Sequence, residues 1–152
     1  MVDDAVSPDP EGVQRIRQSF AKQGLMTTLG ATLEHVSAGT VEISLRPHPS
    51  ISQQHGFIHA GAVSAIADSA AGYAALTLMP SGRGVLTTEF KINLLAPAIG
   101  DRLVARARVI KAGRTLTLAQ TEVFADANGQ EKLVALLTAT LMTVDGREGV
   151  SD

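Results

Sequence analysis

Asp68 is the residue whose type and surroundings could do chemistry, because it is the only Asp, Glu, Lys or Arg between Arg46 and Arg83. At about 100° per residue of a helix, the residues on its face are all small. They are Gly61, Ser64, Ala65, Ala71, Gly72 and Ala75. These small side chains leave a gap beside the helix. A lone carboxylate next to this gap is energetically costly unless it is solvated or serves a function. Two interpretations follow: an Asp that only reaches solvent, or an Asp that is part of a functional site.

The element that must position Asp68 is one long helix, preceded by a loop. From 62 to 78 nearly every residue is apolar or small, many are Ala, and none is Pro, which favours a helix. His59 stands where an N-cap would, so Ala60 would be the first helical residue, and Pro80 with Gly82 would end the helix. A helix that is apolar on nearly all sides is buried. The rest of the chain is therefore expected to wrap around it.

The remaining segments predict a short helix and six strands. Val13, Ile16 and Phe20 recur at helical spacing before Gly24, and 29–36 with 41–46 predict a hairpin. Four more strands follow at 84–95, 102–112, 115–125 and 132–143. The links between these four are too short for parallel crossovers, so the sheet should be mainly antiparallel. The expected fold is α+β, with one curved sheet around one helix.

The composition limits the classes of protein. A chain of 152 residues predicts a single domain, here 12–144, with polar, flexible tails at 1–11 and 145–152. A net charge of −2 argues against nucleic-acid binding. The chain has no Cys and an acidic start without a signal-peptide pattern, and its uncharged window 47–67 is interrupted by Pro, His and Gln. We expect a cytoplasmic protein that is not inserted in a membrane.

The four histidines do not have the spacing of a metal site. They are His35, His48, His55 and His59, with no HExxH motif and no carboxylate near the last two. We interpret His59 as a cap or loop anchor rather than a proton-transfer group. Neither a metal nor a cofactor is expected.

Several segments together resemble one known family. The run His59-Ala60-Gly61-Ala62, followed by Asp68, resembles the His-Gly-Gly-x(6)-Asp motif of hotdog-fold thioesterases of the PaaI (phenylacetate-degradation) type. The segments 84–90, 93–98 and 109–116 follow the order and spacing of that family's strands, so the resemblance covers about 25–144. The chain departs from the family at Gln53, where Asn is frequent, and at Ala60, where Gly is frequent.

The resemblance implies a hotdog fold that pairs into dimers, or dimers of dimers, with sites between protomers. It also implies that Asp68 acts on a thioester, either activating water or attacking as a nucleophile; both roles suit a carboxylate in a partly dry setting. The N–H groups of Ala60 and Gly61, at the positive end of the helix, would stabilise the oxyanion. Gly61 could also be small only because another chain passes close. By resemblance, Gln53 and Thr87 would line the site.

Basic residues are concentrated between Arg83 and Arg114, which holds seven of the thirteen Lys and Arg against two acidic residues. Such an excess suggests a surface for a phosphorylated partner, although ordinary solvated strand faces would look the same. The turn with Lys111, Gly113 and Arg114 is the best candidate for holding coenzyme A phosphates, because its glycine lets the backbone come close.

The predicted function is hydrolysis of an acyl-CoA thioester to a free acid and CoA. A dehydratase on the same fold would pair a His with the helix acid, as His55 and Asp68 could, but that family's proline-rich loop is missing and its acid is typically Glu. A non-catalytic acyl-CoA-binding protein is the third reading. The residues do not distinguish aromatic from aliphatic acyl groups, or CoA from acyl carrier protein.

Overall fold

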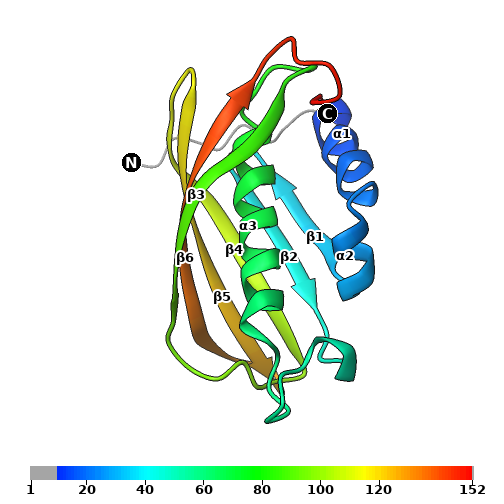
Figure 1. The fold of residues 1–152 in the computed structure, drawn as a ribbon, viewed down its shortest axis with the longest axis vertical. Helices are drawn as coiled ribbons and strands as arrows, with labels where there is room; N and C mark the ends of the chain where they lie inside the picture. Colours follow the sequence, from blue (N-terminus) through cyan, green and yellow to red (C-terminus); the bar gives the residue numbers. More distant parts are fainter. Residues whose placement is uncertain (1–9, 152) are drawn as a thin grey trace.

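The computed structural model describes residues 10–151, which form three α-helices, one 3-10 turn and six strands (Figure 1). In chain order these are α1 (Pro10–Ala21), α2 (Gly24–Leu29), β1 (Thr32–Ser37), β2 (Thr40–Leu45), η1 (Pro49–Ile51), α3 (Ala60–Leu76), β3 (Gly84–Leu94), β4 (Arg102–Ala112), β5 (Leu116–Ala127) and β6 (Gln130–Val144).

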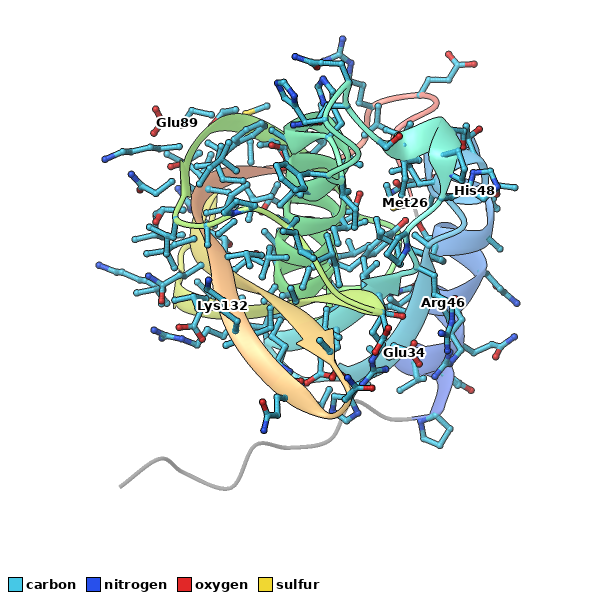
Figure 2. All side chains as sticks on the ribbon, turned by 90° about the horizontal axis from the view of Figure 1, so that it is seen from below. Met26, Glu34, Arg46, His48, Glu89 and Lys132 are labelled. Carbon is cyan, nitrogen blue, oxygen red and sulfur yellow. The ribbon has the colours of Figure 1, made fainter. Side chains whose placement is uncertain are left out.

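The six strands form one antiparallel sheet in the order β1-β2-β4-β5-β6-β3. The sheet curves around α3, which lies across its concave face, while α1 and α2 lie beside the β1 edge (Figure 1). Seen from below, Met26 of α2 and Glu89 of β3 are on opposite sides of α3 (Figure 2). The predicted hotdog arrangement, one helix wrapped by an antiparallel sheet, is therefore confirmed.

Alanine explains how closely the sheet wraps α3. The side chains of Ile66, Ala67 and Ala70 are fully buried against the inner residues of the sheet, such as Ile43 and Leu103. Short side chains on the helix leave room for longer aliphatic ones on the strands, so that the two layers fill the space between them. The helix begins at Ala60 with His59 as its N-cap, as predicted.

The N-terminal region differs from the sequence prediction. Gly24 is predicted to end the first helix, but it is also the first residue of a second helix, α2. The predicted strand 29–36 begins later, at Thr32, as β1. Met26 of α2 is almost fully buried, so the burial of this apolar side chain stabilises the short helix. Residues 1–9 of the predicted tail lie outside the described residues. The helix α1 begins at Pro10, within that predicted tail, which suits a proline in a first helical turn.

The C-terminal residues 145–151 form no helix or strand but fold back toward α1 (Figure 1). Asp145 pairs with Arg83 at 3.0 Å, and Val150 packs on Gly84 at the start of β3. No helix in the described part of the chain is long and apolar enough to span a membrane.

Candidate active site

Asp68 lies in the middle of α3 and accepts a hydrogen bond from Thr87 of β3, with 2.8 Å between Oγ1 and Oδ1. The pairing of β3 with β6 shifts register between Thr87 and Glu89, and such a bulge re-aims the side chains beside it. Burial raises the pKa of the Asp68 carboxyl, and the bond from Thr87 opposes that rise. The carboxylate is thus held in a fixed direction and has a higher proton affinity than in water.

Asp68 and Thr87 line one cavity of about 660 Å³, which we call the Asp68 cavity. Its floor is the small-residue face of α3, including Ala65 and Gly72. One wall comes from α1 and the start of α2, and the other comes from the beginning of β3. The gap that the sequence predicted beside Asp68 is therefore a cavity that can hold a ligand.

The start of α3 provides one backbone donor rather than two. The His59 ring accepts the N–H of Gly61 through Nδ1 at 2.7 Å, so this donor is already used. The N–H of Ala60 has no hydrogen bond to any of the residues 10–151. A Cβ on Gly61 would lie 2.9 Å from His59 Nδ1; within the protomer, the cap itself requires the glycine.

Ala60 and His59 line a second cavity of about 510 Å³, the helix-start cavity, together with Gln53. Its other walls are largely apolar. They are Phe57, Ile58, Val63, Leu94, Leu95, Ala96, Pro97, Ala98 and Val134. The Gln53 side-chain oxygen accepts the N–H of His55, which shapes the loop before the helix. The loop and the helix start therefore form one side of a mostly apolar cleft.

The two cavities are separate within one protomer. Ala60 and Asp68 are eight residues apart on the same straight element, roughly 12 Å at 1.5 Å per residue. A carboxylate and an oxyanion donor that act on one carbonyl must both come within about 3 Å of the reacting atoms. One protomer does not bring these two groups together.

The comparisons with known proteins decide the family. The family model described as the thioesterase superfamily matches residues 55–132, slightly more than half of the chain. The chain belongs to the thioesterase superfamily. A search of curated proteins found no significant match. The general activity that the family and its neighbours support is thioester hydrolysis.

Solved structures agree with this thioesterase assignment. A thioesterase family protein from Silicibacter pomeroyi is 48% identical, with 89% of this chain and 99% of that chain covered and a TM-score of 0.87. The E. coli PaaI protein from the phenylacetic acid degradation operon is 22% identical, with 95% and 99% covered and a TM-score of 0.81. A Haemophilus influenzae thioesterase is 19% identical over 95% and 98% of the two chains, with a TM-score of 0.81. The last two likenesses show the fold.

Lys111 and Arg114 of this thioesterase lie at the end of the sheet opposite the helix start, at the exposed β4–β5 turn. The turn itself requires glycine at position 113, because a Cβ there would lie 2.5 Å from the Leu116 carbonyl oxygen. Other cations of the 83–114 excess are paired: Arg102 with Asp126, and Arg106 with Glu42 and Glu131. The basic surface is thus smaller than the residue count suggested.

Among residues 10–151, no group of three His, Asp or Glu side chains could hold a metal ion. The site also includes residues that sequence reasoning missed. Gln23 donates to Tyr73 Oη at 2.9 Å and accepts from Ser69 at 3.2 Å, all three beside Asp68 in its cavity. The Gln23-Gly24 step looked only like a helix end, and no pattern in the sequence linked it to α3.

Proposed function

We propose that this thioesterase hydrolyses acyl-CoA to a free acid and CoA, with Asp68 as the reacting carboxylate. The observation that carries the proposal is that Asp68, half-buried in a cavity and with a raised pKa, accepts a hydrogen bond from Thr87 and forms no ion pair with any described residue. A carboxylate whose pKa is raised is a stronger base than one in water.

The reaction needs a nucleophile, an oxyanion donor and a proton for the leaving thiolate. Asp68 either removes a proton from water as the water oxygen attacks the thioester carbon, or it attacks that carbon itself to give a mixed anhydride, which water then hydrolyses. In both routes the carbonyl oxygen becomes negatively charged, and the N–H of Ala60 is the donor available for it. The C–S bond then breaks, and the proton that the thiolate takes up comes from the water that is consumed, carried by Asp68 in the general-base route.

We further propose that two copies of the chain build each site. The separation of Ala60 and Asp68 along one helix supports this, because a second copy can bring its own helix start to Asp68. The strand β3 is at the edge of the sheet, and its Leu86, Phe90 and Leu94 are 41%, 46% and 55% exposed. An edge strand with exposed apolar side chains is suited to pair with another copy. A dimer, or a dimer of dimers, is the proposed assembly.

Coenzyme A would be recognised by charge, since its phosphates are anionic. Lys111 and Arg114 are exposed and make no ion pair within residues 10–151. Their turn is far from the helix start of the same protomer, so in the proposed assembly it would serve a site to which the other copy contributes. These two residues are our proposed phosphate ligands.

Release of CoA thiol tests the function directly. Asp68→Asn keeps the shape and the acceptor for Thr87 but removes the base, so we expect thiol release to fall by at least about a hundredfold while the fold is kept. The control is Asp101→Asn, an exposed carboxylate in the β3–β4 connection. Near-normal turnover by a folded Asp68→Asn variant would refute the proposed role.

A further inference from the structure

Part of the wall of the Asp68 cavity is built by segments that flank the family-matched residues 55–132. On one side stands Gln23, at the junction of α1 and α2. On the other side stand Gly149, Val150 and Ser151 of the C-terminal segment. The residues matched by the family model therefore supply Asp68, and the segments before and after them enclose the space next to it.

This space extends along α3 on the C-terminal side of Asp68. The cavity lining reaches Leu76, eight residues further along, or roughly 12 Å. Gly72, one turn after Asp68, forms part of the floor. A Cβ on Gly72 would have Leu141 as its only neighbour within 4 Å among the described residues, at 3.9 Å. A glycine within a helix is destabilising relative to alanine, and packing in this protomer does not require it. Its effect is to leave room above the helix.

Gln23 gives the cavity a polar side wall. It is the N-cap residue of α2, yet its side chain makes no cap hydrogen bond. Its amide is instead directed to α3, where it bonds Tyr73 and Ser69, and Ser19 of α1 is 3.2 Å from the same Tyr73 hydroxyl. Only one of the two amide N–H groups is needed for the bond to Tyr73. The other can bind a polar group of a ligand.

Val150 closes the cavity at the start of β3. A Cβ built on Gly84 would lie 2.7 Å from Val150 Cγ1 and 2.9 Å from the Val150 carbonyl oxygen. The segment thus lies directly on the strand backbone, only three residues before Thr87. The start of this segment is held by the Arg83–Asp145 pair, which is weak because the Asp145 side chain is 65% exposed. Close packing on Gly84 is a further contact of the segment, at the start of β3.

We propose that Gln23 and Val150 determine which acyl groups this enzyme accepts. The inference rests on the proposed function, which places the thioester at Asp68. The acyl group then lies over Gly72, Val150 limits its length, and Gln23 binds a hydrogen-bonding substituent near its end. The substrate class is an acyl group that fits the roughly 12 Å of cavity beyond Asp68 and carries a hydroxyl or similar polar group away from the thioester.

The length limit is tested with a series of straight-chain acyl-CoA esters of increasing length. Val150→Ala and a chain that ends at Asp145 should both move the best substrate to longer chains, with kcat/KM for the first rejected length rising about tenfold. Glu148→Ala, in the same segment but not lining the cavity, should keep the wild-type profile. Profiles that stay unchanged in both Val150→Ala and the shortened chain would overturn the length limit.

The polar wall is tested with pairs of acyl-CoA esters of equal length, with and without a terminal hydroxyl. Gln23→Leu and Gln23→Glu both remove the amide donor, and the ratio of kcat/KM values within a pair should fall about tenfold or more. Gln14→Leu, on the exposed side of α1, should keep the ratio. A ratio unchanged by both Gln23 variants would overturn this role.

The two levels of the proposal can fail separately. If wild-type protein releases thiol in an Asp68-dependent way but the variants share its selectivity, only the inference on Gln23 and Val150 is overturned. If the wild-type protein hydrolyses none of the acyl-CoA esters, the proposed function is overturned and this inference with it.

Discussion

Thr87 and Asp68 are 19 residues apart in the sequence, and their hydrogen bond of 2.8 Å joins the edge strand β3 to the middle of α3. A second bond fixes the helix at the preceding residue, because the fully buried Thr121 of β5 donates to the carbonyl oxygen of Ala67 at 3.0 Å. Asp68 is therefore held from two strands of the sheet, one acting on its side chain and one on its backbone.

The bond from Thr87 sets the pH at which Asp68 ionises. Burial raises the Asp68 pKa and this bond lowers it, so Thr87→Val should raise the pKa further. Since the ionised form reacts, the acidic limb of the kcat/KM profile should move to higher pH, with the loss of rate largest at low pH. Thr88→Val is the matched control, because Thr88 bonds the Thr140 carbonyl instead. An acidic limb at the same pH in wild type and Thr87→Val would contradict the assignment.

The raised pKa also predicts how Asp68 affects stability. The pKa of Asp68 in the folded state is above the unfolded value near 3.8. Between these two pKa values the native state binds more protons than the unfolded state, so stability falls as the pH rises through this interval. The ionised form of Asp68 is therefore the destabilising one. Asp68→Asn should have a higher Tm than wild type at pH 7, and the difference should shrink as the pH falls toward 4. A lower Tm at pH 7 would show that the ionised carboxylate is stabilising.

Local signals were enough to predict α3 and its start. The alanine-rich run, the His59 cap and the turn residues act through residues that are close in the sequence. For the same reason β4 has the predicted bounds. The α2 helix could not be predicted, because Gly24 and two threonines give it little helix propensity and long-range burial of Met26 stabilises it instead. The site follows the same division. Asp68 was identified by its isolation in the sequence, whereas Gln23 and Val150 join the cavity only through long-range packing.

The phosphate role of Lys111 and Arg114 makes a prediction about binding. Replacing both by Ala should raise KM for acyl-CoA several-fold and weaken its salt dependence, with kcat nearly unchanged. A short pantetheine thioester lacks the nucleotide phosphates and should be hardly affected. Lys132→Ala, an exposed cation on β6 (Figure 2), is the control. Equal losses on both substrates would place the phosphates elsewhere.

The backbone donor can be removed by a single proline. Ala60 is the first residue of α3, where proline is tolerated, and His59 already has the extended ψ of 138° that a following proline requires. Ala60→Pro should therefore fold but lose about 10²- to 10³-fold in kcat. Ala60→Gly keeps the N–H and should be nearly silent. A folded Ala60→Pro variant with an unreduced rate would assign the oxyanion to another donor.

Sites shared between two copies can be tested by mixing the two inactive variants. In a two-fold dimer of Asp68→Asn with Ala60→Pro, one site combines the intact Asp68 of one chain with the intact Ala60 of the other. Unfolding and refolding a 1:1 mixture should thus restore roughly a quarter of the wild-type rate, because half of the random pairs are mixed and each has one complete site. Each variant refolded alone is the control.

Light scattering should report a dimer or larger assembly at micromolar concentration. A monomer, or a dimeric mixture with no recovered activity, would contradict a shared site, since each chain would then have to act with its own Ala60 and Asp68, roughly 12 Å apart.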